Sequence, residues 1–219
     1  MARPIPYDSN LTTWTPPQAG RQVLRGLIYG LIVSVIISIG VWGLAKGVDF
    51  KFLSDGTMLA NWAQWLYESQ TGTAIRESVW VFPIVEGTHL LAIALSVGML
   101  CWFDLRLLGL ALRDQPVSKV WNQVMPVAFV GFALMFITGL LLFWAEALTA
   151  YHSVHFWIKL VLLVAAGVNA LSFEATAHKN MAEWDMAAVP PMRARMTGAI
   201  SLILWTAIII TGRTMAYSF

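Results

Sequence analysis

Long apolar runs separated by short polar segments dominate this sequence. A helix needs about 20 mostly apolar residues to cross the roughly 30 Å hydrocarbon layer of a membrane. Five stretches approach that length with at most two charged or histidine residues each: 26–45, 78–103, 120–145, 155–173 and 196–212. The pattern therefore predicts five membrane-spanning helices.

The segment between the first two runs has a shorter, amphipathic pattern. Its apolar positions are Met58, Leu59, Trp62, Trp65 and Leu66, and its polar positions are Asn61, Gln64 and Glu68. This spacing is helical, and tryptophans on one face suit the headgroup layer of a membrane. We expect residues 57–72 to form an interfacial helix over the outer end of the bundle. A lid over a buried site is the alternative.

These elements predict an all-α integral membrane protein. Residues 1–22 are rich in proline and polar side chains and are expected to form a cytoplasmic tail. Residues 23–46 are expected to be an N-terminal transmembrane anchor, because the run is long for a signal peptide and no small-residue cleavage site follows it. Residues 78–217 are expected to form a four-helix transmembrane core.

Composition supports a membrane protein and excludes several other classes. Hydrophobic residues make up 58% of the 219 residues and charged residues only 12%, and the mean hydropathy is +0.67. So few charges cannot keep so many apolar residues in solution, which excludes a soluble nucleic-acid-binding protein. The single cysteine, Cys101, excludes an internal disulfide.

The basic residues divide unevenly between the two sides of the predicted bundle. A cytoplasmic N-terminus places nine of the 14 on that side: Arg3, Arg21, Arg25, Arg106, Arg113, Lys119, Lys179, Arg193 and Arg195. The other five lie outside: Lys46, Lys51, Arg76, Lys159 and Arg213. Because basic residues favour the cytoplasmic side, we expect a cytoplasmic N-terminus and a periplasmic C-terminus.

A short internal repeat is a further hypothesis. Thr138-Gly139 and Thr211-Gly212 both lie near the outer end of a predicted span, 73 residues apart. The same shift aligns Glu86 with Lys159. Spans two and three and spans four and five would then be parallel duplicates, a pattern known in membrane folds. In that case Glu86 and Lys159 lie at one depth.

Four ionisable residues fall in the outer half of the predicted spans: Glu86, His89, Lys159 and Arg213. Charges inside a membrane are unfavourable, so each needs a partner or a function. The structural interpretation is an ion cluster of Glu86, Lys159 and Arg213 that holds the helices together, with His89 as a neutral hydrogen-bonding residue. This structural interpretation does not explain why four ionisable residues are present, because small residues suffice for helix packing in lipid.

A b-type haem is the more specific interpretation. Histidine is the usual protein ligand of haem iron, and His89 lies at a suitable depth. Lys159, Arg213 and Arg76 are candidate partners of the haem propionates. Met135 lies at the depth of a second axial ligand, and a five-coordinate iron is the alternative.

A metal site without porphyrin is another interpretation. Glu86 and His89 have the Glu-x-x-His spacing of carboxylate-bridged metal sites, although only one copy occurs. Glu146, His152 and His155 at the outer mouth are candidates for a copper or zinc entry site. This interpretation leads to a metal-handling or transport protein.

Several of these residues resemble a family of small bacterial four-span membrane proteins of unknown function. The matching segments are 74–80 (AIRESVW), Pro83, Glu86, His89, 104–109 (DLRLLG), Gly131-Phe132, Gly139, Phe143, Lys159, Asn169 and Gly212-Arg213. The resemblance covers residues 57–217 and implies a bacterial inner-membrane protein with an additional first span. The chain is remotely similar to haem-binding four-helix families that include the membrane-type protoporphyrinogen oxidase and the copper-resistance D proteins.

The sequence thus predicts a helical bundle in the lipid bilayer whose outer polar cluster binds haem b for electron transfer. The alternatives are a non-catalytic subunit of a larger membrane complex and a copper-handling protein. Other membrane subunits or further copies of this chain are the expected partners, and nucleic acid is not. The sequence does not decide whether the protein is an enzyme.

Overall fold

A computed structural model describes residues 56–215 of the protein, and this part of the chain is helical with no strand. In chain order its elements are α2 (Met58–Glu68), α3 (Gln70–Arg76), α4 (Val81–Leu107), α5 (Val117–Ala145), α6 (Ala147–His152), α7 (Val154–Ala175), η3 (His178–Asn180), α8 (Met181–Trp184) and α9 (Met192–Met215). The predicted tail at 1–22 and the predicted anchor at 23–46 lie outside the described residues.

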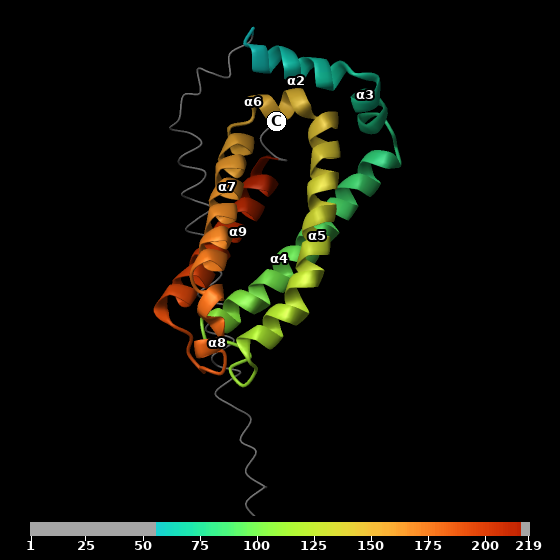
Figure 1. Ribbon diagram of the computed structural model, residues 1–219. Helices are drawn as coiled ribbons and strands as arrows, with labels where there is room; N and C mark the ends of the chain where they lie inside the picture. Colours follow the sequence, from blue (N-terminus) through green and yellow to red (C-terminus); the bar gives the residue numbers. More distant parts are fainter. Residues whose placement is uncertain (1–55, 216–219) are drawn as a thin grey trace, which may run out of the picture.

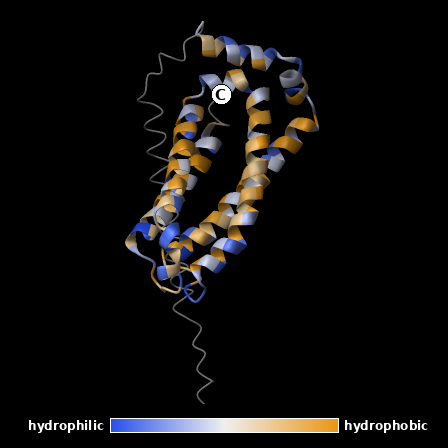
Figure 2. Cartoon of the chain, viewed as in Figure 1, coloured by the Kyte–Doolittle hydropathy of each residue, from blue (hydrophilic) through white to orange (hydrophobic). Residues whose placement is uncertain are grey.

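Four of these helices are long and apolar enough to cross a membrane. They are α4, α5, α9 and the segment Val154–Trp184 that begins with α7. Apolar residues cover their middles, and polar residues gather at both ends (Figure 2). The four predicted core spans are therefore confirmed. Helices α5, α7 and α9 extend a few residues beyond their predicted apolar runs, whereas α4 begins three residues and ends four residues later than its run.

The four helices form two antiparallel pairs. α4 packs along α5, α7 packs along α9, and contacts between α4 and α9 join the pairs. The ribbons of the two pairs meet near α8 and diverge towards α2 (Figure 1). We call the end with α2, α3 and α6 the cap end. The opposite end, with the α4–α5 turn and α8, is the loop end.

Small residues permit the closest helix crossings. A β-carbon on Gly131 of α5 would lie 2.9 Å from both the β-carbon and the backbone nitrogen of Ser96 on α4. A β-carbon on Gly198 of α9 would lie 3.1 Å from the backbone oxygen of Asp104. Close backbone approach is a usual source of helix association in lipid, where the hydrophobic effect between helices is absent.

Aromatic side chains bridge the two pairs at three levels. Near the cap end, Phe143 of α5 stacks on Phe156 of α7 with ring centroids 5.3 Å apart. In the middle, the ring centroids of Phe132 on α5 and Trp205 on α9 lie 5.3 Å apart. Towards the loop end, the rings of Trp121, Phe103 and Phe173 pack together and belong to the main buried core.

The predicted interfacial helix at 57–72 is divided into two. Ser69 has an extended backbone between α2 and α3, and its hydroxyl oxygen accepts a hydrogen bond from the backbone of Gly72. The indole nitrogen of Trp144, on α5, also donates to this hydroxyl at 2.8 Å. Ser69 therefore caps α3 and fixes the bend to the end of α5, and the helical segment continues to Arg76.

Two alanines and Leu66 of α2 pack on the bundle, while Met58, Leu59, Trp62 and Trp65 face outwards. Ala60, Ala63 and Leu66 are buried, and Tyr151 of α6 packs against the two alanines. Trp65 is 63% exposed, and Met58 is 88% exposed. Figure 1 shows α2 lying across the ends of the spans. This placement presents the outward apolar side chains to the boundary layer of a membrane.

A fully buried arginine fastens the loop end. The Arg106 side chain has 0% exposure. Its Nε donates to the carbonyl of Gln115 at 2.9 Å, and its Nη2 donates to the carbonyl of Ala187 at 3.0 Å. One side chain thus holds the α4–α5 turn and the segment before α9 together.

Gly131→Ala is expected to destabilise the protein, because α4 and α5 must separate to admit the methyl group. We expect a loss of about 1–3 kcal/mol in the free energy of unfolding in detergent. Gly98→Ala is the matched control, since a β-carbon there meets nothing within 4 Å. It should leave stability unchanged or slightly increased, because alanine favours helix formation. Equal effects of the two substitutions would contradict the close crossing.

Arg106→Met is expected to lower the free energy of unfolding by about 2–3 kcal/mol, because two buried carbonyls lose a charged donor. Denaturant or thermal unfolding in detergent measures the change. Arg113→Met, at an exposed arginine of the same end, is the control and should have little effect. An Arg106→Met protein as stable as the parent would show that the buried hydrogen bonds do not hold the loop end.

Candidate functional site

His89 is held inside the cap-end half of the α4–α5 pair. It lies eight residues after the start of α4, or about 12 Å along the helix. Its Nδ1 is 2.8 Å from the hydroxyl oxygen of Thr138 on α5. That hydroxyl donates its own hydrogen to the carbonyl of Leu134 at 2.6 Å. The hydroxyl oxygen therefore accepts from Nδ1, and the neutral ring carries its hydrogen on Nδ1.

Gly139 makes room for the imidazole. A β-carbon at this position would lie 3.1 Å from Cε1 of His89 and 3.7 Å from its Nδ1. The Thr138-Gly139 pair therefore supplies both the acceptor and the space for the ring.

The second ring nitrogen of His89 has no partner within the described part of the chain. Nε2 makes no hydrogen bond to residues 56–215, and it is not one of the fully buried side-chain nitrogen or oxygen atoms. In the tautomer fixed by Thr138, Nε2 carries a lone pair. His89 therefore presents an oriented, accessible acceptor inside the apolar layer.

Lys159 of α7 approaches the same region from the other helix pair. Its ammonium lies 3.4 Å from the position of a β-carbon on Gly212 of α9, so the side chain lies against that glycine. Its charge acts on His89 electrostatically. Among residues 56–215 the ammonium has neither a hydrogen bond nor an ion pair, and it is not enclosed by protein. An oriented imidazole and an unpaired cation thus share one layer.

The two helix pairs place these side chains on equivalent positions. Thr211 on α9 is buried and donates to the carbonyl of Ala207 at 2.6 Å, as Thr138 does to Leu134. Lys159 lies against Gly212 as His89 lies against Gly139. The repeated Thr-Gly dipeptides therefore have the same packing role. The shift of 73 residues aligns Lys159 with Glu86. The α4 residue that packs against the glycine is instead His89, one helical turn later.

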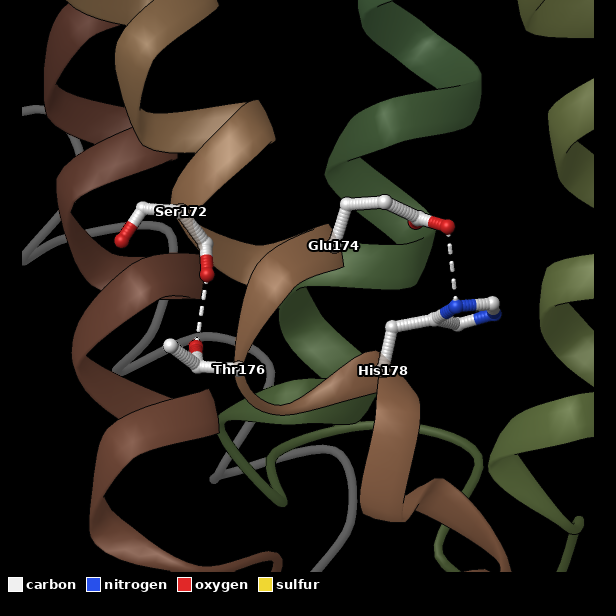
Figure 3. A network of polar contacts seen from close by, with 4 residues as sticks. All are labelled: Ser172, Glu174, Thr176 and His178. Atoms are coloured by element: carbon white, nitrogen blue, oxygen red, sulfur yellow. Dashed lines mark hydrogen bonds and ion pairs between the residues drawn. The ribbon is translucent and has the colours of Figure 1, made fainter.

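Glu86 lies apart from this arrangement. Its side chain is exposed. Glu86 has no ion pair within residues 56–215, whereas at the loop end Oε1 of Glu174 lies 3.1 Å from Nδ1 of His178 (Figure 3). The expected pairing of Glu86 with Lys159 is therefore not formed. In lipid, helix rotation is set by small residues at crossings, and here it turns His89 rather than Glu86 towards α5.

The remaining candidate haem residues have different positions. Arg213 directly follows Gly212 on α9 and is exposed. Met135 is half-buried on α5, and no contact between its sulfur and His89 is found within residues 56–215.

Arg76 serves the cap. Its Nη1 donates to the carbonyl of Ala145 at 2.9 Å and to the carbonyl of Tyr67 at 3.1 Å. The guanidinium also lies over the Tyr67 ring, 3.7 Å from its centre. Ala145 lies seven residues beyond Thr138 on α5, or about 10 Å along the helix. Arg76 therefore fastens α2 and α3 to the end of α5, away from the level of His89.

The expected porphyrin-free metal site receives no support. Over residues 56–215, no group of three or more histidine, cysteine, aspartate or glutamate side chains is placed to hold a metal ion. Glu146 accepts a hydrogen bond from the Thr149 hydroxyl at 3.0 Å. Nε2 of His155 is enclosed without a hydrogen-bond partner. The cap-end ligands are thus not gathered around one point.

Sequence reasoning missed the partners of His89 and the burial of two loop-end residues. Thr138 entered the sequence analysis only through the repeat, and Gly139 through the repeat and the family resemblance, and the spacing of neither residue from His89 indicates a contact. Asp104 is 4% exposed and Arg106 is fully buried, whereas the distribution of basic residues only placed Arg106 on the cytoplasmic side. One carboxylate oxygen of Asp104, Oδ2, has no hydrogen-bond partner within the described range.

The chain belongs to a family of unknown function (DUF6644), whose model matches residues 60–218. This match confirms the resemblance to an uncharacterised family that the sequence indicated. No curated protein matches the chain, and no solved structure matches it. The activity must therefore be argued from the site itself.

Thr138→Val is expected to reduce the population of the Nδ1–H tautomer of His89, because the acceptor of that hydrogen is lost. Nitrogen-15 NMR of histidine-labelled protein measures the tautomer, and His89→Gln assigns the signal. Thr211→Val, at the equivalent position of the other pair, is the control and should leave the His89 signal unchanged. An unaltered tautomer in Thr138→Val would contradict the assigned hydrogen bond.

Proposed function

We propose that this protein binds haem b in the cap-end half of its core, with Nε2 of His89 as an axial ligand, and that it transfers electrons. The observation that carries the proposal is the pairing of an oriented, accessible imidazole nitrogen with an unpaired lysine ammonium inside the apolar layer. Haem b contains both complementary groups, an iron that binds imidazole and carboxylates that bind cations.

The environment of His89 suits an iron ligand. Histidine ligands of metals usually donate their other ring hydrogen to a second residue, which fixes the tautomer and orients the ring. Thr138 is such a residue for His89. Gly139 leaves space beside the ring. The α4–α5 pair thus holds the imidazole in the form that coordinates iron.

Lys159 supplies the cation for a propionate. An ammonium in an apolar layer without a partner is unfavourable, and a carboxylate would neutralise it. Arg213, one residue after Gly212, is the second cation that we assign to the propionates. Arg76 is left out of this role because its donors are engaged at the cap.

His89 is the only axial ligand that the contacts of the chain support among the described residues. Met135 remains the proposed sixth ligand, and a five-coordinate iron is the alternative. When bound, haem b supplies reversible one-electron chemistry. The chain itself orients the imidazole, neutralises the propionates and keeps the group within the apolar layer.

The proposal includes the membrane arrangement. The four described spans and the apolar run at 26–45 would make five crossings of a bacterial inner membrane, with the N-terminus in the cytoplasm. The excess of basic residues on that side, nine of 14, supports this direction.

A non-catalytic subunit of a larger membrane complex, or of an oligomer of this chain, is the second proposal. Helix α7 supports it, because its outward face is broadly apolar and exposed. The exposed residues are Leu160, Val161, Val164, Val168 and Leu171. Such a face can pack against another helix as readily as against lipid. In this case the buried polar groups would serve assembly, and purified protein would be colourless.

An absorption spectrum of protein expressed with sufficient haem tests the first proposal. We expect a Soret band that His89→Ala abolishes and that His152→Ala, at an exposed histidine of α6, retains. Thr138→Val should weaken haem binding by roughly 10–100-fold, the usual effect of losing such a supporting hydrogen bond. Circular dichroism and gel filtration show whether each variant is folded.

Two outcomes would contradict the haem proposal. One is a folded wild-type protein that binds no haem when haem is supplied. The other is a Soret band that persists at full intensity in His89→Ala. If the colourless wild-type protein also purifies with large membrane partners, the subunit proposal replaces it.

A further inference from the structure

An open cavity lies at the loop end, on the opposite side of the core from His89. Its volume is about 440 Å³, within the range of small-ligand sites. It is formed by the end of α7, by η3 and α8, and by the start of α9. The lining residues are Ala175, Thr176, Ala177, Lys179, Asn180, Glu183, Trp184, Pro191 and Arg193.

The cavity carries excess positive charge that the protein does not neutralise. Lys179 and Arg193 line it together with one acidic residue, Glu183, which leaves a formal charge of +1. Neither cation forms an ion pair with any acidic group of the described chain. The nearby carboxylate of Glu174 is outside the lining and pairs with His178 at 3.1 Å (Figure 3). An anion is therefore the complementary ligand.

The depth of the cavity matches the headgroup layer of a membrane. Helix α7 ends at Ala175 and α9 begins at Met192, so the lining lies where two apolar spans meet the polar end. Trp184 is half-buried in the wall, and tryptophan favours this layer. Apolar side chains (Ala175, Ala177 and Pro191) and polar ones (Thr176 and Asn180) share the same surface. This mixture suits a ligand with a charged head and an apolar continuation.

We propose that this cavity binds the phosphodiester headgroup of an anionic membrane lipid. Lys179 and Arg193 hold the phosphate through charge-assisted hydrogen bonds. Asn180 can donate to the headgroup. The Thr176 hydroxyl donates to the carbonyl of Ser172 at 2.6 Å (Figure 3), so its oxygen is left to accept from a headgroup hydroxyl. Basic pockets between spans are known sites for such lipids. This inference is independent of the haem proposal, since no residue is shared.

Native mass spectrometry of the full chain in detergent tests the proposal. Phosphatidylglycerol is added as the anionic probe and phosphatidylcholine as the neutral one, and dissociation constants are measured for each. We expect tighter binding of phosphatidylglycerol. Lys179→Gln and Arg193→Gln should each weaken it by roughly fivefold, the contribution of one basic residue at an anionic surface. The double substitution should weaken it by roughly 25-fold.

Lys119→Gln is the matched control. Lys119 is an exposed basic residue at the start of α5 that does not line the cavity, so its substitution should leave lipid binding unchanged. Equal binding of the two lipids would overturn the proposal, as would equal effects of Lys119→Gln and the cavity substitutions. Displacement of phosphatidylglycerol by millimolar inorganic phosphate would overturn the lipid assignment in favour of a soluble phosphate ligand.

Discussion

The need to satisfy a polar side chain inside an apolar layer shapes the functional half of this protein. His89 meets that need on one side only, by donating its Nδ1 hydrogen to Thr138 at 2.8 Å. The bond fixes the ring and leaves Nε2 without a partner in the described chain. Lys159, on the other helix pair, likewise has no hydrogen-bond or ion-pair partner among the described residues. Because unsatisfied polar groups are unfavourable in lipid, the proposed haem would satisfy both residues, with its iron at His89 and a propionate at Lys159.

The two ends of the bundle have different constructions. At the loop end, an aromatic core and the buried Arg106 draw both helix pairs together. At the cap end, the pairs diverge and are bridged by Phe143 and Phe156 beneath α2. The loop-end contacts thus hold together two helix pairs whose opposite halves leave Nε2 of His89 and the ammonium of Lys159 accessible. The charged cavity outside the loop-end core would fasten that end to the lipid headgroups.

The number of described spans and their positions, to within about four residues at each end, could be predicted from the sequence, because an apolar run of about 20 residues is the length that crosses a membrane. The choice of His89 and Lys159 followed from their charge within those runs. Their partners could not be predicted. Residues of α4 are apolar on all sides, so hydropathy does not define which face meets α5. That rotation is set by local packing, such as Ser96 against Gly131. It exposes Glu86 and turns His89 towards Thr138. Arg76 was likewise assigned by depth alone, while the cap that engages it depends on tertiary contacts.

An experimental density map of the protein purified with haem tests the central claim most directly. The account predicts porphyrin density on the Nε2 side of His89, with Thr138 bonded to Nδ1 and a propionate beside Lys159. A map in which the His89 ring faces acyl chains, or in which Nε2 bonds to another side chain and no porphyrin is present, would contradict it.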